Sequence, residues 1–238
     1  MSLEGRVILV TGASRGLGAA VALACAARGA KLVLAARTGG ALEEIDDAIR
    51  RQGSEPATLA VLDLTKGELI DGLGRSLFDR FGRLDGLVAA AGELGVITPV
   101  SHLEPTLLQR LLAVNLVANQ RLIRSVDPLL RAAPDARAVF VTDGACGPGR
   151  AYWGGYAATK AALEALVLAY AAELRLTPVH VNLFDPGPIA TRLRAQAYPG
   201  EPAGSVPDPA VPAAALVELL RPDYTGRGQI VRYVPPPE

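Results

Sequence analysis

The chain has 238 residues, of which 50% are hydrophobic, so it is long enough to bury a sizeable core in a single α/β domain. Its 24 basic and 24 acidic residues balance, which gives no electrostatic reason to expect a nucleic-acid or membrane partner. No apolar stretch is long enough to span a bilayer, and no signal peptide is expected. Cys25 and Cys146 lack the spacing of a disulfide framework or a metal site, so we expect a cytoplasmic protein without bound metal.

Short apolar runs recur along the chain, and helix-length segments separate them: 6–11, 31–36, 57–62, 86–91, 137–142, 179–184 and 229–234. Apolar runs without alternation are typical of parallel strands that are buried on both faces. The pattern therefore predicts a three-layer, doubly wound α/β fold with no domain boundary. Between the second and third runs, Asp46 with Arg50 and Asp47 with Arg51 have i,i+4 spacing, which indicates a solvated helix face.

A glycine-rich segment, TGASRGLG, follows the first predicted strand and precedes a helical run. Gly12, Gly16 and Gly18 allow a tight turn and a close approach of the backbone to a pyrophosphate. The N–H groups at the start of the helix would then meet the negative charge of that group. The spacing is GxxxGxG, and its place in the first βα unit predicts dinucleotide binding.

The residues after the second predicted strand indicate which dinucleotide is preferred. An acid at this position would bond a ribose 2′-hydroxyl, whereas an arginine would accept a 2′-phosphate. Here the strand ends at Ala36 and Arg37 follows, with Arg15 of the glycine-rich segment as a second cation. Two arginines and no acid favour NADP over NAD.

Tyr156 and Lys160 lie four residues apart in an Ala- and Leu-rich segment, so they share one face of a predicted helix. A phenol is a weak acid or base at neutral pH unless a nearby cation favours its ionised form. Lys160 can provide that positive charge. The pair therefore predicts general acid–base catalysis by Tyr156.

On these motifs the chain resembles the short-chain dehydrogenase/reductase family from about residue 4 to residue 235. The resemblance implies a seven-stranded Rossmann-like parallel sheet, hydride transfer between NAD(P) and an alcohol or carbonyl, and a homo-oligomer, either a dimer or a tetramer. It implies catalytic roles for Tyr156, Lys160 and Asn115, the last through a backbone group that helps to hold a relay water. The implied cofactor contacts are Gly12, Ser14, Arg15, Gly16, Leu17, Gly18, Arg37, Asp63, Leu64, Ala91, Gly92, Tyr156, Lys160, Pro186, Gly187, Ile189 and Thr191.

The chain departs from the family pattern at two places. Ala89 and Ala90 replace asparagines before Ala91 and Gly92, which concerns mainly hydrogen bonding between strands. Asp143 stands thirteen residues before Tyr156, where the family has a serine that donates a hydrogen bond to the substrate oxygen. An ionised carboxylate only accepts hydrogen bonds, and it opposes the negative charge that hydride addition builds on a carbonyl oxygen.

Three interpretations of Asp143 stay open. In the first, an apolar setting keeps the carboxyl group protonated, so that it donates as the serine would. In the second, the carboxylate accepts from a substrate hydroxyl or ammonium group. In the third, ketone reduction is lost and the protein only binds a dinucleotide. Thr142 is the adjacent hydroxyl, but strand alternation points it away from the side of Asp143.

Seven prolines lie between Pro186 and Pro212, and a loop of this length predicts a substrate lid at about residues 187–209, or else a surface excursion or oligomer contact. Tyr152, Trp153 and Tyr198 are candidates for an aromatic substrate wall, although packing explains them equally well. Asp185 is interpreted as a loop-capping acid. His102 and His180 have no nucleophile to pair with. We therefore expect an NADP(H)-dependent oxidoreductase acting on a small-molecule alcohol or carbonyl, or alternatively a catalytically impaired dinucleotide-binding protein.

Overall fold

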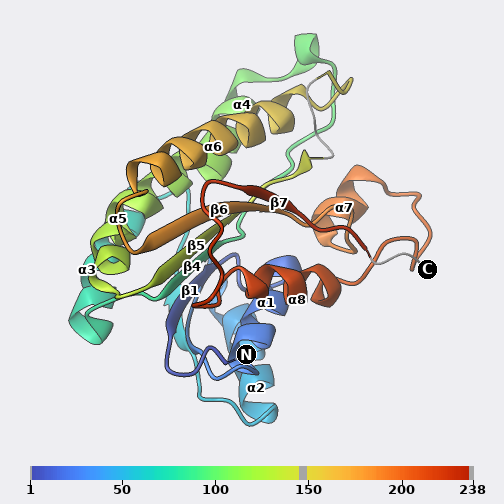
Figure 1. Cartoon of the computed structure of the whole chain (residues 1–238). Helices are drawn as coiled ribbons and strands as arrows, with labels where there is room; N and C mark the ends of the chain where they lie inside the picture. Colours follow the sequence, from blue (N-terminus) through green and yellow to red (C-terminus); the bar gives the residue numbers. More distant parts are fainter. Residues whose placement is uncertain (1, 145–148, 236–238) are drawn as a thin grey trace.

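The computed structural model describes residues 2–144 and 149–235, so the predicted loop position of Cys146 lies outside the described residues. The strands form one parallel sheet in the order β3-β2-β1-β4-β5-β6-β7 (Figure 1). Their bounds are β1 Val7–Thr11, β2 Lys31–Ala36, β3 Thr58–Val61, β4 Gly86–Ala89, β5 Ala136–Val141, β6 Val179–Asp185 and β7 Ile230–Arg232. The expected seven-stranded, doubly wound fold is confirmed, and each strand falls within one residue of an expected run or inside it.

Helices connect the strands and cover both faces of the sheet. Their bounds are α1 Gly16–Ala26, α2 Gly39–Arg51, α3 Gly67–Phe81, α4 Pro105–Leu112, α5 Ala118–Ala132, α6 Gly154–Glu173, α7 Arg192–Ala197 and α8 Ala210–Glu218. A 3₁₀ turn, η1, spans Val100–His102, and a π-helical segment, η2, spans Ala113–Val117. Helices α3, α5 and α6 lie on one face, and α1, α2 and α8 lie on the other (Figure 1).

Alternating side chains of each central strand enter two separate cores. In β1, Leu9 packs in the core below α3, α5 and α6, whereas Ile8 and Val10 pack in the core below α1, α2 and α8. In β5, Phe140 belongs to the first core and Val139 to the second. Because both faces need apolar groups, the central strands are continuous apolar runs.

Two expectations about burial are wrong. The edge strand β3 is only partly buried and β7 is mostly exposed, because each has a neighbouring strand on one side only. Asp46 does not lie on a solvated face: its side chain is buried and accepts from the backbone N of Ala57 at 2.6 Å and from Arg50 Nε at 2.8 Å. It therefore ties α2 to the segment that enters β3.

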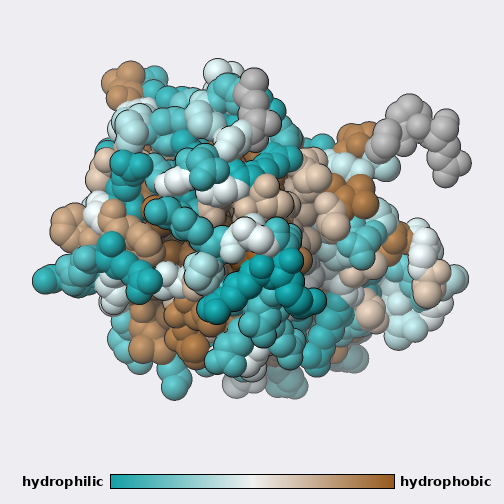
Figure 2. Space-filling model, turned by 90° about the horizontal axis from the view of Figure 1, so that it is seen from below, coloured by the Kyte–Doolittle hydropathy of each residue, from teal (hydrophilic) through white to brown (hydrophobic). Residues whose placement is uncertain are grey.

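The surface reflects the balanced composition of the chain. Figure 2 shows one face, on which hydrophilic residues predominate and hydrophobic residues form smaller patches between them. Among the described residues, no helix has the length and apolar character that a membrane span requires, and no group of acidic, histidine or cysteine side chains could hold a metal ion.

Candidate active site

A cleft of about 630 Å³ opens at the carboxyl ends of the central strands. The chain order of the sheet reverses between β1 and β4, and ligands of open α/β sheets bind at such a switch point. Every cofactor contact expected from the sequence lines this cleft, and so does Asp143. Asn115 is fully buried behind the wall of the cleft.

The glycine-rich segment forms a cradle that side chains would fill. A Cβ atom built on Gly18 would overlap the carbonyl oxygen of Gly12, and one built on Gly12 would lie 2.8 Å from backbone atoms of Ala91. Helix α1 begins inside this segment, and Arg15 at its N-cap position makes no capping bond through its side chain. The first N–H groups of the helix therefore face the cleft as an anion-binding site, and the residues present fit a dinucleotide.

The part of the cleft next to the ends of β2 and β3 carries charges of both signs. Asp63 Oδ1 accepts from the backbone N and the hydroxyl of Thr65 at 2.9 and 2.8 Å. These two hydrogen bonds, the backbone bond foremost, lower the pKa of Asp63 below its ordinary value. Arg37, whose side chain is half exposed, lies 3.3 Å from the carboxylate of Glu93.

Tyr156 and Lys160 are on the first turns of α6, and both side chains are buried. Lys160 Nζ donates to the carbonyl oxygen of Val141 at 2.9 Å and lies 5.7 Å from the centroid of the Tyr156 ring. The backbone of β5 therefore holds the ammonium group beside the phenol. This arrangement places a positive charge where it stabilises a phenolate.

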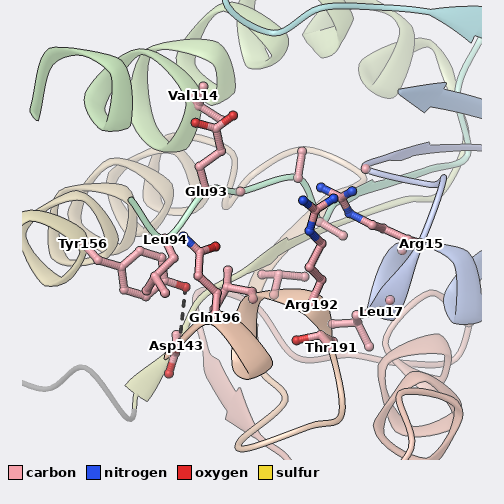
Figure 3. Close-up of a pocket in the computed structure, with 18 of the residues that line it drawn as sticks. Arg15, Leu17, Glu93, Leu94, Val114, Asp143, Tyr156, Thr191, Arg192 and Gln196 are labelled. Atoms are coloured by element: carbon pink, nitrogen blue, oxygen red, sulfur yellow. Dashed lines mark hydrogen bonds between the residues drawn. The ribbon is translucent and has the colours of Figure 1, made fainter. Parts of the chain in front are cut away.

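Asp143 lies just beyond β5 and contacts the phenol of Tyr156. The Tyr156 hydroxyl donates to Asp143 Oδ2 at 3.4 Å, as the dashed line in Figure 3 marks. The Thr142 hydroxyl donates to Glu164 Oε1 at 2.6 Å, so its proton is committed to another residue of α6. Of the side chains of Thr142, Asp143 and Glu164, that of Asp143 is the one whose carboxylate accepts from the Tyr156 hydroxyl.

Asn115 supports the wall of the cleft through the bonds of its side chain to Glu93. It lies in the π-helical segment between α4 and α5, a geometry that often marks functional sites. Its Oδ1 accepts from the backbone N of Glu93 at 2.9 Å, and its Nδ2 donates to the Glu93 carbonyl at 2.9 Å and to Thr159 at 3.0 Å. Its carbonyl oxygen accepts from Asn119 Nδ2 at 2.9 Å. A carbonyl oxygen has two lone pairs, so this bond leaves the predicted contact with a relay water untested.

The loop after β6 lines one side of the cleft. Asp185 Oδ1 accepts from the backbone N of Gly187 at 3.0 Å, so Asp185 caps this loop, and its Oδ2 accepts from Arg232 Nε at 2.9 Å. Thr191 begins helix α7 and its hydroxyl accepts from the backbone N of Arg194 at 3.2 Å. A Cβ on Gly16 would lie 3.3 Å from the Thr191 methyl group, so this loop packs against the glycine-rich segment.

The predicted lid is not a continuous loop, because α7 forms within it. Arg194 donates to both carboxylate oxygens of Glu201, and its guanidinium carbon lies 3.6 Å from the centroid of the Tyr198 ring. Tyr198 in turn lies against Trp153, with ring centroids 6.0 Å apart. Trp153 and Tyr198 thus form an aromatic wall of the cleft, whereas Tyr152 is exposed and is not part of the lining.

Sequence reasoning missed four charged residues of the cleft: Glu93, Arg110, Arg192 and Arg194. Arg110 Nε and Nη2 donate to the two carboxylate oxygens of Glu93 at 2.8 and 2.9 Å. In Figure 3, Arg192 from α7 and Arg15 from the glycine-rich segment point toward the same part of the cleft. The place of Glu93, directly after Ala91 and Gly92, was the available signal for its proximity.

Comparison with known proteins identifies the family. A model described as short chain dehydrogenase matches residues 6–202. The chain belongs to the short-chain dehydrogenase family. The oxidoreductase YciK of Escherichia coli strain K12, itself uncharacterised, is 33% identical over 210 residues, which are 87% of this chain and 83% of that protein.

Solved short-chain dehydrogenases confirm the fold. One from Pseudomonas syringae has 39% sequence identity and a TM-score of 0.93, covering 97% of this chain and 95% of that chain. Another, from Escherichia coli CFT073 and complexed with NADPH, has 31% identity and a TM-score of 0.92, covering 97% of both chains. This protein is therefore an oxidoreductase of the short-chain dehydrogenase type.

Proposed function

We propose that the protein interconverts an alcohol and a carbonyl on a small molecule and uses NADP(H) in preference to NAD(H). The observation that carries this proposal is that Tyr156 and Lys160, both buried, line a cleft at the carboxyl ends of the strands, with Lys160 held beside the phenol by the Val141 carbonyl. Arg15 and Arg37 at the cleft, and a similar structure that contains NADPH, support the preference.

Different residues of the chain donate the proton, stabilise the charge and contact the substrate. NADPH, when bound, supplies the hydride. During reduction Tyr156 gives its hydroxyl proton to the carbonyl oxygen, and Lys160 stabilises the phenolate that remains. The buried positions of both side chains strengthen this electrostatic effect, because little water screens it. Trp153 and Tyr198 offer apolar contact to the body of the substrate.

Asp143 decides how well this reduction proceeds. While its carboxylate accepts the Tyr156 proton, that proton is directed away from a substrate oxygen. A protonated Asp143 would instead donate to the substrate oxygen, as the serine of the family does. A substrate with a hydroxyl or ammonium group beside the carbonyl would give an ionised Asp143 a donor of its own.

The test is NADPH oxidation by the purified protein with ketones, aldehydes and quinones between pH 5 and pH 9. We expect turnover that the Tyr156→Phe variant lowers about 100-fold or more, measured at an NADPH concentration that saturates the variant. Turnover confined to low pH would assign Asp143 as a protonated donor. Turnover that persists in Tyr156→Phe would contradict the proposed role of the phenol.

A second candidate is a dinucleotide-binding protein without efficient turnover. The contact between Asp143 and the Tyr156 hydroxyl favours it, because an ionised carboxylate opposes charge on the substrate oxygen. The same assay separates the candidates: NADPH binding without turnover on any substrate at any pH would support this one. We further propose a cytoplasmic homo-oligomer, either a dimer or a tetramer, which sedimentation velocity would test.

A further inference from the structure

Glu93 lies in the cleft and forms ion pairs with two arginines, Arg37 and Arg110. Arg37 comes from the end of β2, Glu93 follows β4, and Arg110 lies on α4, so the ion pairs join three separate elements across the cleft. In Figure 3 the Glu93 carboxylate points away from Tyr156 and Asp143. The Glu93 side chain therefore faces away from the proton-transfer residues.

The two ion pairs of Glu93 differ in geometry. Arg110 binds both carboxylate oxygens, at 2.8 and 2.9 Å, whereas Arg37 makes one contact of 3.3 Å to Oε1. Paired, bidentate hydrogen bonds are the stronger kind. Arg110 is thus the anchor of the carboxylate, and Arg37 is the partner that separates more easily.

Arg37 is also the residue expected to receive a ribose 2′-phosphate. A carboxylate 3.3 Å from its guanidinium competes with that phosphate for the same N–H groups and repels its negative charge. A cofactor with a free 2′-hydroxyl has no charged phosphate at this position, so the Glu93 carboxylate neither competes with it for Arg37 nor repels it. Glu93 therefore acts on one cofactor and not on the other.

We infer that Glu93 is a specificity-determining residue that weakens 2′-phosphate binding by pairing with Arg37, and that Arg110 limits this effect by holding Glu93. This inference rests on the proposed NADP(H) function. It makes the preference for NADP(H) the outcome of two opposed groups, Arg37 that attracts the phosphate and Glu93 that opposes it. The backbone clamp between Glu93 and Asn115 does not involve the carboxylate and persists when the side chain is changed.

The experiment measures the dissociation constants of NADPH and NADH by fluorescence titration at fixed ionic strength, without any substrate. In Glu93→Gln, which keeps the shape of the side chain, we expect NADPH to bind about two- to fivefold more tightly, as befits one partly exposed ion pair, with NADH unchanged. In Arg110→Gln, Glu93 pairs with Arg37 alone, and NADPH binding should weaken relative to NADH. Adding Glu93→Gln to Arg37→Gln should give a smaller gain than in the wild type, because only the direct repulsion of the phosphate is then removed.

An unchanged ratio of the two constants in Glu93→Gln, or tighter binding of NADPH by Arg110→Gln, would overturn the inference and leave the proposed function standing. Failure of the wild-type chain to bind either dinucleotide would overturn both. Thermal unfolding of each variant without ligand shows whether the fold is retained. Since Arg110→Gln and Glu93→Gln shift NADPH affinity in opposite directions, general destabilisation cannot imitate the expected pattern.

Discussion

The side chain at position 143 affects how well negative charge on a substrate oxygen is stabilised. Its carboxylate lies 3.4 Å from the Tyr156 hydroxyl, and the neighbouring Thr142 hydroxyl is committed to Glu164. A hydrogen-bond donor at position 143 would stabilise charge on the substrate oxygen, whereas an ionised acceptor opposes it. A substitution at this position can remove the negative charge while it keeps the shape of the side chain.

In Asp143→Asn the shape is kept, the charge is removed and an N–H donor is gained. We expect kcat/KM for ketone reduction at pH 7.5 to rise about tenfold or more, and Asp143→Ser to change it in the same direction. Steady-state kinetics with NADPH would measure both. If both variants were slower than the wild type at every pH, with NADPH binding unchanged, Asp143 would serve the reaction as a carboxylate.

Residues that act through local spacing could be predicted from the sequence, whereas long-range ion pairs could not. Tyr156 and Lys160 meet because one helical turn separates them, and Gly12, Gly16 and Gly18 share one turn. Glu93 contacts Arg37 from 56 residues away and Arg110 from 17 residues away. Those contacts depend on how β2, β4 and α4 are placed in space, and no periodicity in the sequence encodes that placement.

Among the elements, helix α3 shows how two glycines of one helix have opposite roles. Gly72 is exposed, and a Cβ atom there would meet no atom within 4 Å. Gly74 is buried against α5: its backbone N donates to the Ser125 hydroxyl at 2.8 Å, and a Cβ atom would overlap the Ser125 carbonyl oxygen. The absence of a side chain at Gly74 therefore allows the two helices to touch.

We expect Gly72→Ala to raise the free energy of unfolding by about 0.5–1 kcal/mol, since alanine favours the helix. Gly74→Ala should lower it by about 1–3 kcal/mol, because α3 must move away from α5. Urea unfolding of the two variants measures both, and each serves as the control for the other. Equal changes in the two variants would show that close packing at Ser125 does not limit stability.

The elements also show where prediction from sequence stops. The central strands were predicted because burial on both faces produces continuous apolar runs. Helix α7 was not predicted, since six residues between prolines and glycines carry no clear helical pattern, and the contacts of Arg194 with Glu201 and Tyr198 hold it in place. Asp46 was wrongly predicted to face solvent, because the backbone N–H whose hydrogen bond it accepts belongs to Ala57, beyond the helix.

Across the whole molecule, the two ends of the sheet carry different kinds of polar group. The carboxyl ends open into the cleft. Near the amino ends, Arg137 on β5 is buried and donates to the carbonyl oxygens of Tyr224 and Pro222 at 3.1 and 2.6 Å. Desolvation by burial is the main cause of its lowered pKa, with Asp135 opposing the shift. The buried Arg137 guanidinium thus holds this end of the sheet to backbone carbonyls of the segment before β7.

His180, at the start of β6, makes the stability of this end depend on pH. Arg227 Nη2 lies 2.7 Å from His180 Nε2, and an arginine can only donate, so this nitrogen is the acceptor of a neutral imidazole. Burial foremost, and then Arg137 and Arg227, lower the pKa of His180 below its ordinary value of 6.5. Protonation removes the acceptor and sets a second positive charge against Arg227.

Since the pKa is lower in the folded chain, the unfolded chain binds this proton first as the pH falls. The stabilising effect of a neutral His180 is therefore complete above about pH 6.5 and decreases below it, toward the pKa of the folded chain. We expect the melting temperature to fall between pH 7.5 and pH 5.5, and to fall less in His180→Gln. His102→Gln, at an exposed position, is the matched control and should retain the full wild-type dependence. If His180→Gln and the wild type showed the same pH dependence, groups other than this imidazole would set the acid sensitivity of the fold.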